Sequence, residues 1–178
     1  MPKISICETD VLILCGGLGT RFREVENNIP KALAPINGTP FIDLLLNDLV
    51  DQGFRRIILA TGHLSSKLEQ YVKGRKDAEY IISFESEPMG TGGAIKLAER
   101  HIRSDIFLIL NGDTHIQLGY SHMINFHLQM ESDFTICLSN INDKSDFGSV
   151  CLSDKKRIIS FNEKKIINNS LTNAGVYC

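Results

Sequence analysis

LCGGLGTRFREVENNIPK, residues 14–31, is the segment that decides how this chain is interpreted. It continues a short apolar run, Val11–Cys15, for which we predict a buried strand. Three glycines then fall within four positions: Gly16, Gly17 and Gly19. Glycine tolerates positive φ and lets the backbone approach a ligand closely, and N–H groups at a loop-to-helix junction form an anion site. Because Arg21 and Lys31 add positive charge, we expect this segment to hold a triphosphate.

The glycine loop differs from two common phosphate-binding motifs. GLGTRF has Phe22 where the dinucleotide-binding fingerprint requires a third glycine. No lysine follows the glycines at the spacing of a Walker loop. The loop by itself therefore predicts phosphate binding without naming a class of enzyme.

Short apolar runs alternate with helical patterns along the first 140 residues. We expect strands at 11–15, 56–61, 79–84, 106–110 and 134–139. Helices are expected from an N-cap at Thr39 to Gly53, from Leu64 to Gly74, around 94–102, and from a cap at Ser121 to Met130. This rhythm predicts an α/β fold, a Rossmann-like three-layer sandwich with a mostly parallel sheet. Ligands bind such sheets beyond the carboxyl ends of the strands.

The pattern changes toward the end of the sequence. Two short strands, 147–152 and 157–161, flank a polar turn and predict a β-hairpin laid over the main sheet. Val176 and Tyr177 have strand character with no later segment to pair beside them. We therefore expect one domain, residues 1–178, that lacks the C-terminal part of its fold.

Composition narrows the possible partners. The formal net charge is −2, so no basic surplus favours a nucleic acid. The five cysteines show no CxxC pair, which argues against a zinc site and favours free thiols in a reducing compartment. We expect neither a signal peptide nor a membrane span. The sequence thus predicts a cytoplasmic protein that does not bind membranes.

Further blocks follow the glycine loop in a fixed order. They are PK at 30–31, KALAP at 31–35, GTP at 38–40, GTGGA at 90–94, NGD at 111–113, FG at 147–148, EK at 163–164 and NAG at 173–175. Together with GGLGTR at 16–21, they resemble the sugar-phosphate nucleotidyltransferases over nearly the whole chain. The resemblance implies a GT-A-like nucleotidyltransferase fold. It also implies an enzyme that condenses an NTP with a sugar 1-phosphate to give an NDP-sugar and pyrophosphate.

The resemblance assigns the phosphate chemistry to particular positions. The loop residues Gly16, Gly17, Gly19 and Thr20 would hold the triphosphate, with Arg21 and Lys31 as the catalytic charges. Asp113 follows a buried strand and would be catalytic as a ligand of Mg²⁺, a cation that prefers oxygen ligands. Relatives hold the metal with a second aspartate, for which the sequence offers no candidate.

The resemblance also predicts where the base and the sugar bind. The EPMGTGGA segment would lie against the nucleoside through Glu87, Gly90, Thr91 and Gly92. The sequence of this segment is similar to that of guanylyltransferases for heptose 1-phosphate and mannose 1-phosphate in capsule or lipopolysaccharide synthesis. Guanine is therefore the preferred base, with a uridylyltransferase as the alternative. The sugar would be held by three residues: Gly148, Glu163 and Asn173. A homodimer is the default assembly that the resemblance implies.

Two other functions compete with this hypothesis. A truncated or degenerate relative could bind nucleotide or sugar phosphate without turnover, as the missing second aspartate suggests. A GT-A-like glycosyltransferase usually needs a DxD pair of carboxylates, whereas Asp113-Thr114-His115 supplies only one. The nucleotidyltransferase remains the leading prediction.

Overall fold

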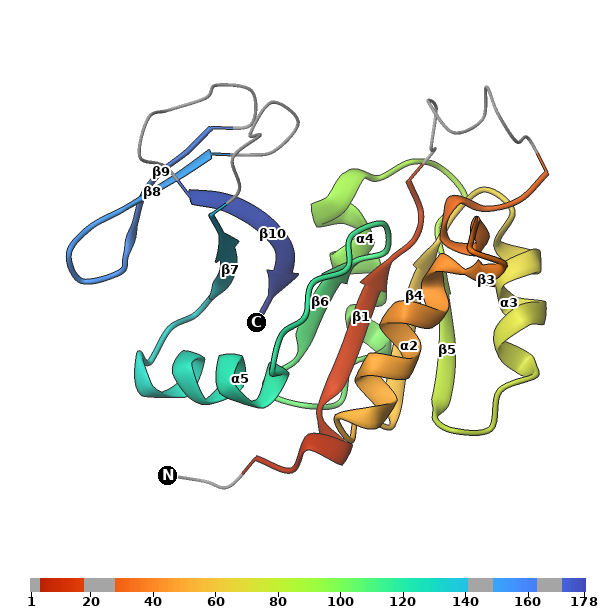
Figure 1. Ribbon diagram of the computed structural model, residues 1–178. Helices are drawn as coiled ribbons and strands as arrows, with labels where there is room; N and C mark the ends of the chain where they lie inside the picture. Colours follow the sequence, from red (N-terminus) through yellow and green to blue (C-terminus); the bar gives the residue numbers. More distant parts are fainter. Residues whose placement is uncertain (1–3, 18–27, 141–148, 163–170) are drawn as a thin grey trace. The chain divides into compact units, whose positions relative to one another are not determined.

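The computed structural model describes residues 4–17, 28–140, 149–162 and 171–178 (Figure 1). The chain divides into two compact units, Met1–His122 and Met123–Cys178. The predicted α/β architecture is confirmed, because a parallel sheet with helices forms the first unit and antiparallel strands form the second. No helix in the described segments is long and apolar enough to cross a membrane.

Four parallel strands form the centre of the first unit, in the order β5–β4–β1–β6. Their bounds are β1 (Asp10–Leu14), β4 (Arg56–Thr61), β5 (Glu79–Phe84) and β6 (Leu108–Asn111). All six residues of β4 are buried, as expected for the interior of a sheet covered on both faces. The sequence predicted the bounds of β4 and β5 without error.

In the described part of the chain, three α-helices lie between these strands: α2 (Phe41–Asp51), α3 (Ser65–Lys73) and α4 (Gly90–Ala98). The path runs from β1 to β4 to β5 in one direction and then returns to β6 on the other side of β1. Because such crossovers are right-handed, α2 and α4 lie on opposite faces of the sheet (Figure 1). The strand order therefore reverses between β1 and β6, where ligands bind sheets of this kind.

Short elements complete the first unit. They are the 3-10 turns η1 (Ile6–Glu8), η2 (Lys31–Leu33) and η3 (Glu99–His101), and a two-stranded hairpin of β2 (Pro35–Ile36) and β3 (Thr39–Pro40). The core is made by apolar side chains of β1, β4 and one face of α2, including Leu45, Leu46 and Leu49. Phe54 packs edge-to-face on Tyr120, with ring centroids 5.9 Å apart.

The amino-terminal edge of the sheet holds a buried ionic network around Asp10. One carboxylate oxygen of Asp10 pairs with Arg56 Nη1, and the other accepts hydrogen bonds from the backbone N–H groups of Arg103 and Ser104. Burial by itself would raise the pKa of Asp10, but these hydrogen bonds and the Arg56 charge outweigh it and lower that pKa. The network fixes the start of β1 to its neighbours.

The second unit is an antiparallel sheet. Helix α5 (Tyr120–Gln129) spans the boundary between the units and leads into it. The strands of this sheet are β7 (Ile136–Ser139), β8 (Ser149–Leu152), β9 (Ile158–Asn162) and β10 (Leu171–Tyr177). β10 pairs with β7 on one side and β8 on the other, and β8 pairs with β9. The predicted β8–β9 hairpin is confirmed.

A β-bulge interrupts β10 at the NAG block. The register with β7 shifts between Asn173 and Tyr177, and Gly175 has φ +71°. The Asn173 side chain closes the bulge: its Oδ1 accepts from Gly175 N at 3.0 Å, and its Nδ2 donates to Tyr177 Oη at 2.8 Å. The glycine is required there because L-residues rarely adopt positive φ.

Four predictions about local structure were wrong. Thr39 is not an N-cap, because it pairs in the β2–β3 hairpin and α2 begins at Phe41. Ser121 lies inside α5, which starts one residue earlier. Gly90–Gly93 is the first turn of α4 rather than a loop before it. The strand at Val176 does have partners, because antiparallel pairing uses the earlier strands β7 and β8.

Candidate active site

Two strand ends meet at the switch point of the first unit. Leu14 of β1 lies beside Asn111 of β6, and Gly112 N donates to Leu14 O at 3.0 Å. A Cβ atom on Gly112 would lie 2.7 Å from Leu14 O and 2.9 Å from Cys15 Sγ. Only glycine lets the backbone pass so close, and this close passage holds Asp113 beside the end of β1.

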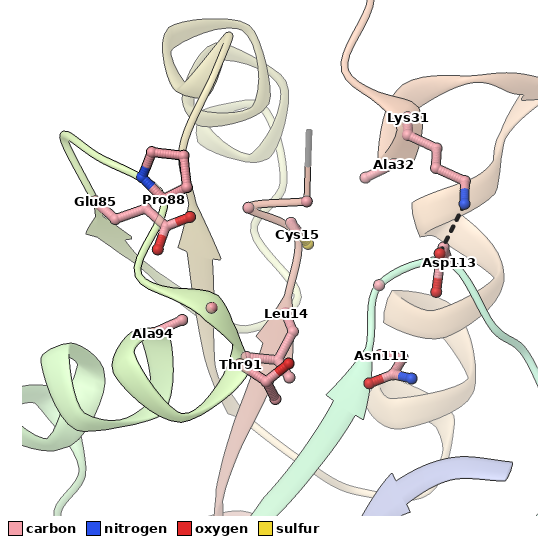
Figure 2. A pocket seen from close by; sticks show the side chains of 14 residues that line it. Leu14, Cys15, Lys31, Ala32, Glu85, Pro88, Thr91, Ala94, Asn111 and Asp113 are labelled. Atoms are coloured by element: carbon pink, nitrogen blue, oxygen red, sulfur yellow. Dashed lines mark hydrogen bonds and ion pairs between the residues drawn. The ribbon is translucent and has the colours of Figure 1, made fainter. Parts of the chain in front are cut away.

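A pocket of about 420 Å³ lies over these strand ends (Figure 2). The segments after β1 and β6, the η2 turn and the start of α4 all contribute to it. Its lining consists of Leu14, Cys15, Gly16, Gly17, Lys31, Ala32, Glu85, Pro88, Gly90, Thr91, Ala94, Asn111, Gly112 and Asp113. The tertiary structure therefore brings together six of the predicted site residues: Gly16, Gly17, Lys31, Gly90, Thr91 and Asp113.

The charged end of this pocket is an ion pair. Lys31 Nζ donates to Asp113 Oδ2 at 2.7 Å, and both side chains are about half exposed, at 49% and 47%. Lys31 opens the η2 turn directly after Pro30, which fixes where its side chain begins. The pair puts a mobile cation and a hard oxygen donor side by side, as phosphate chemistry with a divalent cation requires.

A second carboxylate, Glu85, lies at the opposite end of the pocket. Figure 2 shows it across Cys15 from the Lys31–Asp113 pair. Glu85 directly follows β5, and its Oε2 accepts from Met89 N at 3.4 Å. We missed this residue in the sequence, although one signal pointed to it. Like Asp113, it is an acid within two residues of the carboxyl end of a parallel strand.

The glycines at the start of α4 differ in what requires a glycine at each position. Gly90 has φ +69°, which glycine adopts without strain. A Cβ on Gly93 would lie 2.5 Å from Met89 Cβ, so packing excludes a side chain. At Gly92, no described atom lies within 4 Å of the added Cβ. The open space there and the N–H groups of a helix N-terminus suit an anionic or polar ligand.

The remaining predicted site residues lie elsewhere. Glu87 lines a neighbouring hollow of about 700 Å³, which shares Gly16, Glu85 and Pro88 with the pocket. Asn173 belongs to the second unit, where its amide closes the bulge. Five further predicted positions lie outside the described residues: Gly19, Thr20, Arg21, Gly148 and Glu163.

Cys15 lines the pocket but does not supply a nucleophile. Its burial, with the nearby negative charge of Asp113, raises the pKa of the thiol to about 12. The thiol is therefore neutral at physiological pH. All five cysteines are free.

Carboxylates, histidines and cysteines do not cluster in the described part of the chain. No group of three or more of them there could hold a metal ion by itself. Among the described residues that line the pocket, Asp113 is the one carboxylate at the Lys31 end, so a cation held there would need further oxygens, such as those of a substrate phosphate. That arrangement suits Mg²⁺, which is usually bound by one or two carboxylates together with phosphates.

Comparison with known protein families shows which family this chain belongs to. The sequence profile described as Nucleotidyl transferase matches residues 10–178. The chain belongs to this family. It is therefore a nucleotidyltransferase by descent, and the family generally uses a divalent metal.

Individual family members agree with this assignment. The chain is 36% identical over 168 residues to the D-glycero-alpha-D-manno-heptose 1-phosphate guanylyltransferase of Campylobacter jejuni, covering 93% of this chain and 73% of that protein. It is 37% identical over 169 residues to the enzyme of the same name from Aneurinibacillus thermoaerophilus, covering 94% and 73%. The crystal structure of HddC from Yersinia pseudotuberculosis complexed with GMP-PN superposes with a TM-score of 0.84 at 36% identity, covering 95% of this chain and 75% of that one.

Proposed function

We propose that the protein transfers a guanylyl group from GTP to the phosphate of a sugar 1-phosphate, releasing pyrophosphate and forming a GDP-sugar. The observation that carries this proposal is the pocket with the Lys31–Asp113 pair at one end and Glu85 at the other. A nucleoside triphosphate is a ligand with a polyanionic end and a hydrogen-bonding base at the other end. The two ends of the pocket suit these two ends of the ligand.

The Lys31 end suits the phosphates. A phosphate oxygen of the sugar 1-phosphate attacks the α-phosphorus in line, and the bond to the pyrophosphate oxygen breaks. The protein contributes mainly position and charge to such a transfer. Lys31, which pairs with Asp113 in this structure, exchanges that partner for phosphate oxygens. Gly16 and Gly17 offer backbone N–H groups to the phosphates. We propose that Gly19, Thr20 and Arg21 also bind the triphosphate.

Asp113 is the residue that we propose as the Mg²⁺ ligand. Its carboxylate offers hard oxygens at the pocket edge, and the triphosphate would add further oxygens beside it. When bound, the cation neutralises phosphate charge and polarises the phosphoryl group under attack. Gly112 and the Leu14 carbonyl keep this carboxylate at the strand end whether or not a cation is present.

Glu85 supports guanine as the base. A carboxylate offers two acceptor oxygens, and guanine presents two adjacent donors, its ring N1–H and its exocyclic amino group. Uracil presents one N–H between two carbonyl oxygens, which leaves one carboxylate oxygen facing an acceptor. Gly90, Thr91 and Gly92, with Glu87 in the adjoining hollow, would lie along the nucleoside. The names of the relatives point to the same base.

The proposal extends to the identity of the acceptor sugar. A heptose 1-phosphate is supported by the names of two relatives that are 36% and 37% identical. Gly148, Glu163 and Asn173 remain the proposed sugar contacts, and the product would feed surface polysaccharide or lipopolysaccharide synthesis. The homodimer also stays a prediction. We further propose a cytoplasmic location, because free thiols are typical of reducing compartments.

A pyrophosphate-release assay tests this function directly. The purified chain is incubated with Mg²⁺, one of four NTPs and heptose, mannose, glucose or muramate phosphates. We expect the highest kcat/KM with GTP, and a fall of about 10- to 100-fold in that value for Glu85→Gln. A folded chain without turnover on any pair would reject the enzyme and favour a nucleotide-binding module. A preference for UTP would instead reject guanine as the base.

A further inference from the structure

Three neighbouring strands of the first unit end at the same level, and the residues that follow them form a row. β1 and β4 pair Leu14 with Ala60, and β4 and β5 pair Thr61 with Phe84. The hydrogen bonds Cys15 N to Ala60 O and Glu85 N to Thr61 O extend this register past the strand ends. Gly16, Gly62 and Glu85 therefore lie side by side across the sheet edge.

The Glu85 side chain runs along this row over Gly62. A Cβ atom on Gly62 would lie 3.2 Å from Glu85 Oε1 and 3.4 Å from its Cγ. A Cβ atom on Gly16 would lie 2.6 Å from the same Oε1. The carboxylate thus starts from β5, crosses the end of β4 and reaches the end of β1, where the pocket begins. The two glycines leave this path free, because neither carries a side chain.

We propose that Gly62 is a positioning residue for base selection, which keeps the Glu85 carboxylate inside the nucleotide pocket. This inference rests on the proposed function of Glu85 as the guanine contact. Gly62 does not need to touch the nucleotide. A methyl group at this position would push the Glu85 side chain aside by a few tenths of an ångström, because contacts of 3.2 to 3.4 Å are tighter than ordinary packing allows, and the Gly16 carbonyl oxygen at 3.3 Å limits movement of the methyl group itself. Neither Lys31 nor Asp113 is among the atoms within 4 Å that this methyl group would meet first.

ITP is the probe that isolates this effect, because inosine has the N1–H of guanine but not its amino group. We expect the wild-type protein to favour GTP over ITP by about 10- to 100-fold in kcat/KM, since a hydrogen bond to a carboxylate is lost. Gly62→Ala should lower this ratio by about tenfold, through a higher KM for GTP with kcat retained. General damage to the site would lower kcat/KM equally for GTP and ITP and would leave their ratio unchanged.

A double-mutant cycle identifies the side chain through which Gly62 acts. Glu85→Ala should bring the GTP-to-ITP ratio near one, and adding Gly62→Ala should change that ratio less than twofold, because the group that the methyl displaces is gone. Gly74→Ala is the matched control, since Gly74 ends α3 with φ −71° outside the pocket. It should keep the wild-type ratio.

A further variant keeps the test decisive if Gly62→Ala does not fold. Glu85→Asp retains the carboxylate but shortens its reach along the row, so the ratio should fall as it does for Gly62→Ala. The proposal is overturned if Glu85→Asp or a folded Gly62→Ala keeps the wild-type ratio. Calorimetric affinities for GTP and ITP give the same comparison without turnover. A chain that binds selectively but does not react would therefore reject the proposed reaction and leave this inference standing.

Discussion

Replacing Lys31 with methionine should separate activity from stability. Met keeps an unbranched side chain of similar length and removes only the ammonium group. In this structure Lys31 pairs with Asp113 at 2.7 Å, and the two side chains are 49% and 47% exposed. Ion pairs with this exposure contribute only about 0–1 kcal/mol to folding, because solvent screens them and the side chains lose entropy.

The same ammonium should contribute far more to the reaction. Negative charge is redistributed at the α-phosphoryl group in the transition state, and a single preorganised donor there stabilises it by about 3 kcal/mol. About 3 kcal/mol corresponds to a loss of roughly 100-fold in rate. We therefore expect Lys31→Met to lower kcat by about two orders of magnitude while the free energy of unfolding changes by less than about 1 kcal/mol.

The measurements are initial rates of pyrophosphate release and urea unfolding followed by circular dichroism. Lys73→Met is the matched control, because Lys73 forms a comparable surface ion pair with Glu69 at 2.9 Å on α3, outside the pocket. Both variants should unfold at nearly the wild-type urea midpoint, and only Lys31→Met should lose activity. The reasoning is refuted if Lys31→Met loses less than about fivefold in kcat, or if it is destabilised by more than about 2 kcal/mol.

Two further predictions concern the parts of the fold that support the site. Asp10→Asn should lower the free energy of unfolding by about 3 kcal/mol, because it leaves the buried Arg56 charge without its Asp10 partner. Because folding lowers the pKa of Asp10, its contribution is complete above the unfolded pKa of about 3.9 and is lost as the pH falls through the folded value. Urea titrations from pH 3 to 7 should therefore show the difference from wild type shrinking at the acid end, and a constant difference would contradict this. Gly175→Ala should destabilise the chain by about 1–2 kcal/mol because of φ +71°, as judged by its urea midpoint, whereas an unchanged midpoint would argue against strain at the bulge.

Local sequence patterns predicted most of the strands. β4 and β5 were predicted to the residue, because each is a short apolar run bounded by polar or glycine-containing turns. Helix starts were predicted less well. Thr39 and Ser121 are good capping residues by type, but hairpin pairing uses Thr39 and α5 begins before Ser121. At Thr39, local hairpin pairing with Ile36 overrides a cap preference of about 1 kcal/mol.

The candidate site was predicted in part. Lys31 and Asp113 were both selected from their motifs, but nothing in the sequence predicted that they form an ion pair, because they lie 82 positions apart. Glu85 and Gly62 were not selected at all. Their importance comes from the register of β1, β4 and β5, and no local pattern specifies a register between strands that lie far apart in sequence.

The sequence by itself determined the α/β rhythm, the glycine-rich loop after β1 and the ordered blocks that identify the family. These features depend on neighbouring residues, so they can be recognised along the chain. Only the tertiary structure decided that one pocket has the Lys31–Asp113 pair at one end and Glu85 at the other. The physical reason is that parallel strands align their carboxyl ends, so residues distant in sequence become neighbours only after the sheet has formed.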